Sequence, residues 1–336
     1  MFFSSKKSVL GVDIGTDNIK IAQVSTKDNV HTLDTYGIVN VTFQFEEGKD
    51  ESIVRTANVL KNLIVKADVT TKKVVASLPN SAVFTSVIEM PKMSDSELKS
   101  AVEFEAKKYV PLPMTELALS WVVLEKTAEG KNTVLITAVP NAVLSSYMKI
   151  FQLAGLTPIA LEIEALALIR SIVGEDKGNN LLIDIGARST HLNIIDHGNL
   201  VLARNVPIGG QTITSKIAES LKISMGRAEQ FKKDFGINQS SLIPETIKPI
   251  LQSLKIEAKQ LQSIYQARGK KFDKIVLAGG SANLPGLEEF FGDLGPKVVL
   301  GDPLNRLTYD SSLKYLLQQY SGSLAVAIGL ALRVTK

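Results

Sequence analysis

The tripeptide Asp-Ile-Gly occurs twice, roughly half the chain apart, and it limits the possible folds more than any other feature. One copy lies in LGVDIGTD (residues 10–17) and the other in LLIDIGARST (residues 181–190). Each copy follows an apolar run and precedes a second strand-like run, which predicts a strand, a tight glycine turn and a returning strand. A single Asp-x-Gly is common at hairpin turns. Two copies that each open one half of the chain predict a duplicated α/β fold.

Both turns carry groups suited to phosphate binding. Gly15 and Gly186 permit positive φ and a close approach of backbone amides to an anion. Asp13 and Asp184 favour a polyphosphate only through a divalent cation or its waters. Further hydroxyl donors to phosphate oxygens are Thr16, Ser189 and Thr190. Two such hairpins facing each other would hold the phosphates of a nucleotide from both sides.

Other glycines extend this candidate site. The strand predicted at 272–277 leads into Gly279-Gly280-Ser281, with Asn283 beyond, and glycines at the carboxyl end of a strand let a base or ribose approach closely. Gly209 and Gly210 precede a helix start, where amides can bind anions. Glu229 and Lys232 lie three residues apart on a predicted helix and share a face. Their spacing fits a surface ion pair and a ribose contact equally well.

Composition excludes several function classes. The 336 residues are 45% hydrophobic, which fits about two domains, and the net charge of +4 comes without a basic stripe typical of nucleic-acid binding. The absence of cysteine excludes disulfides, cysteine-ligated zinc and a cysteine nucleophile. Histidines 31, 191 and 197 lack metal spacing, and we expect His191 and His197 at the surface. Neither a signal peptide nor a membrane-spanning run is predicted.

The predicted elements divide the chain into two halves and an insert. Strands are predicted at 9–14, 19–24, 31–41, 73–78, 82–88, 117–124, 133–138, 159–163, 181–185, 191–195, 200–206 and 272–277. Helices are predicted at 52–65, from a Ser94–Glu97 capping box to Pro111, from an Asn141 cap to Gly155, and at 165–173, 211–221, 224–235 and 245–268. The C-terminal stretch SLAVAIGLALRVTK is expected to be a buried helix.

These elements suggest three parts. The first half spans 8–81, completed by 159–178 and 322–336, and a β-α-β-β-α insert occupies 82–158. The second half spans 179–321 and contains a helical part at about 222–270.

The motifs LGVDIGTDNIK, LLIDIGARST and VLAGGSANLPGL, with the last helix SLAVAIGLALR, resemble those of the actin/Hsp70/sugar-kinase superfamily. Within it, MPKMSDSELKSAVEFEAKKYVPLP and AVAIGLALR are similar to the PilM proteins of type IV pilus assembly, relatives of the division protein FtsA. The resemblance covers nearly the whole chain. It implies an actin-like, ribonuclease H-like duplicated fold with a nucleotide cleft between the halves and an FtsA/PilM-type extra subdomain.

The resemblance also implies a cofactor and its ligands. The cleft would bind ATP or ADP, and Asp13 and Asp184 would orient Mg2+ through water. Phosphate contacts would come from Gly15, Thr16, Asn18, Lys20, Gly186, Arg188, Ser189 and Thr190. Contacts elsewhere on the nucleotide would come from Gly209, Gly210, Glu229, Lys232, Gly279, Gly280, Ser281 and Asn283.

A partner is implied as well. A groove beside the extra subdomain would take the extended, apolar N-terminal tail of the membrane protein PilN, which places the chain in the cytoplasm, peripheral to the inner membrane. Apolar character suggests that Phe84, Ile88, Phe104 and Tyr109 contact this tail, although core packing is the expected fate of at least half of them. The sequence leaves open whether the protein also associates with itself.

The second hairpin departs from the pattern of active ATPases. Ala187-Arg188 stands where they commonly have Gly-Gly-Thr, so nucleotide binding with at most weak hydrolysis is expected, and Arg188 itself is suited to bidentate phosphate binding. Glu162 and Glu164 are candidates for orienting water, or solvated charges at a helix end. The alternative functions are an FtsA-like division scaffold and a small-molecule (sugar) kinase. The insert suits peptide recognition better than sugar binding.

Overall fold

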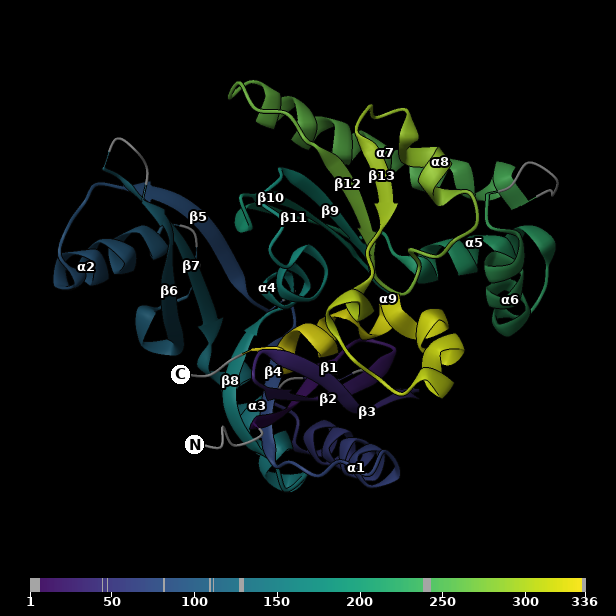
Figure 1. Ribbon diagram of the computed structural model, residues 1–336, viewed down its shortest axis with the longest axis horizontal. Coiled ribbons are helices and arrows are strands. Elements are labelled where there is room, and N and C mark those ends of the chain that lie inside the picture. The colour runs from purple at the N-terminus through teal and green to yellow at the C-terminus, as the bar shows by residue number, and fades with distance from the viewer. Residues whose placement is uncertain are drawn as a thin grey trace. The chain divides into compact units, whose positions relative to one another are not determined.

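The computed structural model describes residues 7–43, 45–46, 48–80, 82–108, 110, 112–126, 130–237 and 243–333 (Figure 1). The chain forms two compact units. The first comprises Met1–Ile172, Pro303–Lys314 and Val326–Lys336, and the second comprises Val173–Asp302 and Tyr315–Ala325. The sequence predicts three parts, with the insert counted separately, and this finer division stays a proposal.

The first unit contains a five-stranded sheet with the order β3-β2-β1-β4-β8. Its strands are β1 (Lys7–Ile14), β2 (Asn18–Lys27), β3 (Val30–Asn40), β4 (Lys73–Leu78) and β8 (Thr157–Ile163). The helices α1 (Asp50–Lys66) and α3 (Asn141–Leu153) contribute to its core, in which Leu10, Leu60 and Phe151 are fully buried. Every third or fourth residue of α1 is apolar and buried, as its helical spacing predicts.

The second unit repeats this topology. Its sheet has the order β11-β10-β9-β12-β13 and is formed by β9 (Asn180–Ile185), β10 (Thr190–Asp196), β11 (Asn199–Val206), β12 (Lys274–Ala278) and β13 (Lys297–Leu300). In both sheets two antiparallel hairpin strands lead outward from the central strand and two parallel strands follow on its other side. The predicted duplication of an α/β half is therefore confirmed.

Helices complete the second unit. They are α5 (Gly210–Leu221), α6 (Met225–Phe235), α7 (Ile243–Gln266) and α8 (Leu287–Gly292). The apolar face predicted for the long helix is buried, since Ile247, Leu251 and Leu261 of α7 join the same core as the strands. The sequence pattern did not reveal α8 or β13, which are only six and four residues long.

The insert forms a three-stranded sheet with the order β5-β7-β6, accompanied by α2. Its elements are β5 (Phe84–Met90), α2 (Asp95–Ala106), β6 (Leu117–Lys126) and β7 (Asn132–Pro140). The capping box is confirmed: Ser94 N donates to Glu97 Oε2 (2.8 Å), and Glu97 N donates to Ser94 Oγ (3.4 Å).

The last helix predicted for the insert behaves differently. Val143, Tyr147 and Phe151 of α3 are buried in the core of the β1–β4 sheet rather than in the insert's own core. The predicted side-chain cap by Asn141 was wrong, because Pro140 occupies the cap position and Asn141 Nδ2 donates to the carbonyl of Thr115 (3.1 Å).

The buried carboxylate of Glu162, in β8, forms hydrogen bonds with residues of the chain that follows. The short helix α4 (Glu164–Leu168) continues into a π-helical turn, Ile169–Val173. Glu162 accepts bonds from Arg170 on both oxygens (2.8 and 3.0 Å) and from Arg333 Nη1 (2.7 Å). Short 3-10 turns lie at Met114–Glu116, Pro303–Arg306 and Ser311–Leu313.

The predicted last helix is part of α9 (Lys314–Ala331), which passes from one unit to the other. A Cβ at Gly11 would lie 1.9 Å from the carbonyl oxygen of Ala327, so only glycine lets the helix approach β1 this closely.

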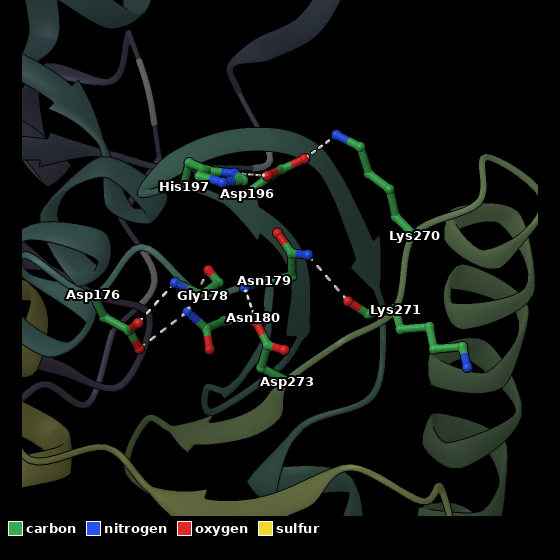
Figure 2. Close-up of polar contacts among 9 residues, drawn as sticks. All are labelled: Asp176, Gly178, Asn179, Asn180, Asp196, His197, Lys270, Lys271 and Asp273. Carbon is green, nitrogen blue, oxygen red and sulfur yellow. Dashed lines mark hydrogen bonds and ion pairs between the residues drawn. The ribbon is translucent and has the colours of Figure 1, made fainter.

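A polar cluster closes the amino-terminal end of the second sheet (Figure 2). The buried carboxylate of Asp196 accepts hydrogen bonds from Lys270 and from the exposed ring of His197. Burial raises the pKa of Asp196, but these bonds outweigh it and hold the pKa below its ordinary value. Beside it, Asp273 Oδ2 accepts the amide of Asn179 (2.7 Å). The cluster ties three chain segments together and confirms the surface position predicted for His197.

Candidate functional site

The first Asp-Ile-Gly hairpin joins β1 to β2 and holds Asp13 in a fixed position. Asp13 is the penultimate residue of β1 and is 3% exposed. Its Oδ2 accepts a hydrogen bond from Lys20 Nζ and its Oδ1 one from Ser77 Oγ, both at 2.8 Å. Lys20 is the register partner of Asp13 on β2, and Ser77 comes from the neighbouring strand β4. The turn is closed by Gly15 N, which donates to Asn18 O (3.0 Å).

The second hairpin, in the second unit, has the same construction. Asp184 is the penultimate residue of β9, is 5% exposed and is the register partner of His191 on β10. His191 Nδ1 lies 3.7 Å from Asp184 Oδ2, and its Nε2 lies 3.4 Å from Ser189 Oγ. Gly186 N donates to Ser189 O (3.0 Å). The surface position predicted for His191 was wrong, since its side chain is only 15% exposed beside Asp184.

The start of α5 is fastened to this hairpin. Gly210 N donates to Gly186 O (2.9 Å), and Gln211 N donates to Ala187 O (2.8 Å). A Cβ at Gly209 would lie 2.6 Å from the carbonyl oxygen of Ala187, so this contact requires glycine. Thr190 is buried, and its hydroxyl donates to Ile208 O (2.7 Å). The proton of this hydroxyl is therefore bonded within the protein.

Glu229 and Lys232 of α6 form a partly buried network with α5. Lys232 is 5% exposed and lies 2.7 Å from Glu229 Oε2. Lys232 Nζ also donates to Thr214 Oγ1 (3.0 Å) and to Gly210 O (3.3 Å). Burial raises the pKa of Glu229, but hydrogen bonds from Lys232 and Thr214 outweigh it and leave the pKa below its ordinary value. The pair therefore connects α6 to Gly210 at the start of α5 and is not a surface ion pair.

The glycine loop after β12 lies against the second hairpin. Gly279 has φ +88°, and a Cβ there would lie 2.5 Å from Asp184 Oδ1 and 2.5 Å from Ile185 O. Ser281 N donates to Ile185 O (3.3 Å). A Cβ at Gly210 would lie 2.4 Å from Ser281 Oγ. The loop, the hairpin and the start of α5 thus converge.

Within each unit, several of the residues predicted from the sequence lie close together. The first unit brings together Asp13, Gly15, Asn18 and Lys20, with Thr16 exposed at the turn. The second brings together Asp184, Gly186, Ser189, Gly209, Gly210, Glu229, Lys232, Gly279 and Ser281. Arg188, Gly280 and Asn283 are exposed on these loops.

Sequence reasoning missed Ser77, Thr214 and His191. Ser77 and Thr214 stand in ordinary strand and helix sequences, and the structure alone places them on Asp13 and Glu229. His191 carried a signal, because it follows Asp184 at the same spacing at which Lys20 follows Asp13.

The residues proposed for peptide binding differ in their surroundings. Ile88 packs against the core of the insert, and Phe84 is half-buried at the start of β5. Phe104 is 64% exposed on α2, with Lys108 Nζ 5.0 Å from its ring centroid. Tyr109 lies outside the described residues.

These sites fit a nucleotide with a hard cation. Buried aspartates at strand ends suit Mg2+, which keeps several waters and takes few protein ligands. A Cβ at Gly279 would lie 2.5 Å from Asp184 Oδ1, so only glycine lets the backbone of this loop approach the carboxylate so closely. Of the helices in the described part of the chain, none is long and apolar enough to cross a membrane.

Two similar five-stranded sheets, each opening with an Asp-Ile-Gly hairpin, define an actin-like protein. Solved structures agree: the chain matches MreB5 of Spiroplasma citri bound to AMPPNP with a TM-score of 0.53 over 97% of this chain and 95% of that one, at 13% identity.

More specifically, the chain belongs to the family of the type IV pilus assembly protein PilM, whose family model matches residues 11–335. It is similar to a chain of the PilM-PilN type IV pilus biogenesis complex, with 27% identity and a TM-score of 0.86 over 97% of this chain and 98% of that one. It also resembles the cell division protein FtsA of Bacillus subtilis (strain 168), at 22% identity over 85% of this chain and 76% of the relative.

Proposed function

We propose that this chain is a nucleotide-binding scaffold of type IV pilus assembly that docks on the inner-membrane complex by binding the N-terminal tail of PilN. One observation carries the proposal: nearly the whole chain is similar to a chain of a solved PilM-PilN complex. The same proposal places it on the cytoplasmic side of the inner membrane, held there through its partners.

The nucleotide is ATP or ADP with Mg2+. In this proposal Asp13 and Asp184 orient waters of the cation, and bound Mg2+ supplies charge neutralisation at the phosphates. Lys20 Nζ donates a hydrogen bond to Asp13, the carboxylate that we propose for the waters of the cation. We therefore propose that the Lys20 ammonium also contacts a phosphate. Gly279, Gly280 and Ser281 follow the carboxyl end of β12, where we propose that the nucleoside binds.

Binding is proposed with at most weak hydrolysis. We propose a structural role for Glu162, because both of its oxygens accept hydrogen bonds from Arg170 and Arg333. Glu164 begins α4 and accepts a hydrogen bond from Asn80 Nδ2 (2.9 Å), so it remains the candidate for orienting water.

The insert is the proposed docking surface for the tail. Both outer strands of its sheet, β5 and β6, are edges, and an extended peptide can pair with such an edge while its side chains enter neighbouring pockets. Phe84 and Phe104 offer apolar surface there, whereas Ile88 serves the insert's core.

Co-purification from cells tests the proposal. The protein is isolated in mild detergent, the bound nucleotide is identified after denaturation, and membrane partners are identified by mass spectrometry. ATP or ADP together with PilN is expected. A folded protein that carries neither refutes the proposal.

A further inference from the structure

The amides at the start of α5 are already used. Gly210 N and Gln211 N donate to the carbonyls of Gly186 and Ala187, and Thr212 N donates to Gly209 O (3.1 Å). A helix N-terminus binds an anion through such amides. At α5 the amides of Gly210 and Gln211 clamp the second hairpin instead, so these two donors are not available to a phosphate near it.

Arg188 is the cationic side chain at the tip of this hairpin. It is exposed, and its Nε donates to Gln211 Oε1 at 3.3 Å. This is a long hydrogen bond to a neutral acceptor, and bonds from a guanidinium to an anionic oxygen are about twice as strong. A guanidinium also matches a phosphate with a planar, two-pronged set of donors.

We infer that Arg188 binds the terminal phosphate of a nucleoside triphosphate. The guanidinium would then exchange its hydrogen bond with Gln211 for bonds to that phosphate. The inference rests on the proposed nucleotide binding. The backbone clamp holds Gly186 and Ala187 in place, so only the Arg188 side chain needs to move. Gln211 Oε1 accepts a hydrogen bond from the guanidinium and holds it near the hairpin. Arg188 is therefore a specificity-determining residue for ATP over ADP.

Calorimetry of the full chain with AMPPNP and ADP, at fixed free Mg2+, tests this. Arg188→Ala is expected to weaken AMPPNP binding about 10- to 100-fold and ADP binding less than about threefold. Arg188→Lys is expected to fall between, because it keeps the charge and loses the fork. Gln211→Glu should weaken AMPPNP selectively by offering Arg188 a competing carboxylate.

Arg204→Ala is the matched control. Arg204 is another arginine of the second unit, and its side chain is bonded to Glu257 (2.7 Å) and Gln260 (3.0 Å) of α7. It should leave both affinities unchanged. Equal losses for AMPPNP and ADP in Arg188→Ala, or no loss in either, overturn the inference. Failure of the unaltered protein to bind any nucleotide would instead refute the proposed function.

Discussion

Asp184 and His191 face each other across the second hairpin, with Oδ2 and Nδ1 3.7 Å apart. Asp13 and Lys20 hold the same positions in the first hairpin, at 2.8 Å. The duplicated hairpins therefore pair a strand-end carboxylate with a basic side chain in both copies. Lys20 forms an ion pair with its carboxylate at 2.8 Å, whereas His191 lies 3.7 Å from Asp184.

Asp13→Asn is expected to weaken binding of Mg2+·ADP about 10-fold or more, because it removes the charge that orients the cation's waters while keeping an acceptor for Ser77. Calorimetry with and without Mg2+ measures this loss. Asp34→Asn is the control, since Asp34 also accepts from a serine and a long side chain, Ser25 and Gln23, away from the hairpin. Similar losses in both variants would contradict the assignment.

Gly279→Ala is expected to abolish nucleotide binding and destabilise the fold. The new Cβ would lie 2.5 Å from Asp184 Oδ1, in addition to the cost of positive φ. Gly269→Ala is the matched control, because Gly269 has φ +74° and open space around its Cβ position. Chemical unfolding should show a loss of about 1–2 kcal/mol for Gly269→Ala and a larger one for Gly279→Ala. Equal losses would mean that the contact with Asp184 carries no cost.

Glu229 should contribute to stability only above acidic pH. Its pKa is lowered in the folded state, so its contribution is fully present above the ordinary value of 4.5 and is lost as pH falls through the folded pKa. Unfolding of the protein and of Glu229→Gln, compared at pH 7, 5, 4 and 3, should give a constant difference from pH 7 to 5 that shrinks at lower pH. A difference that grows on acidification would show the opposite shift.

Phe104→Ala is expected to weaken binding of a PilN tail peptide while changing the free energy of unfolding by less than about 0.5 kcal/mol, because the ring is exposed. Fluorescence anisotropy of a labelled tail measures the affinity. Tyr315→Ala removes another exposed aromatic ring, on α9, and should leave the affinity unchanged. If Phe104→Ala binds the tail as the unaltered protein does, α2 is not part of the docking surface.

Much of this architecture could be predicted because it depends on local patterns. The glycine turns, the strands that flank them and the apolar face of α7 each depend on residues close together in the sequence. The structure confirms all three. The contacts that complete the site are long-range. Ser77 lies 64 residues from Asp13, and no local spacing connects the two side chains.

The same reason explains the errors. Asn141 reads as a helix cap, but its side chain bonds to the carbonyl of Thr115, 26 residues away. Glu162 reads as a water-orienting candidate or a solvated charge at a helix end, yet it is buried and accepts hydrogen bonds from Arg170 and from Arg333, which lies 171 residues further along the chain. Packing between distant segments decided these positions, and local propensity did not.

The most direct test is a calorimetric titration of the full chain with Mg2+·ADP, followed by a synthetic PilN N-terminal tail. The account predicts one nucleotide and one tail bound per chain. A folded protein that gives no binding signal with either ligand would contradict it.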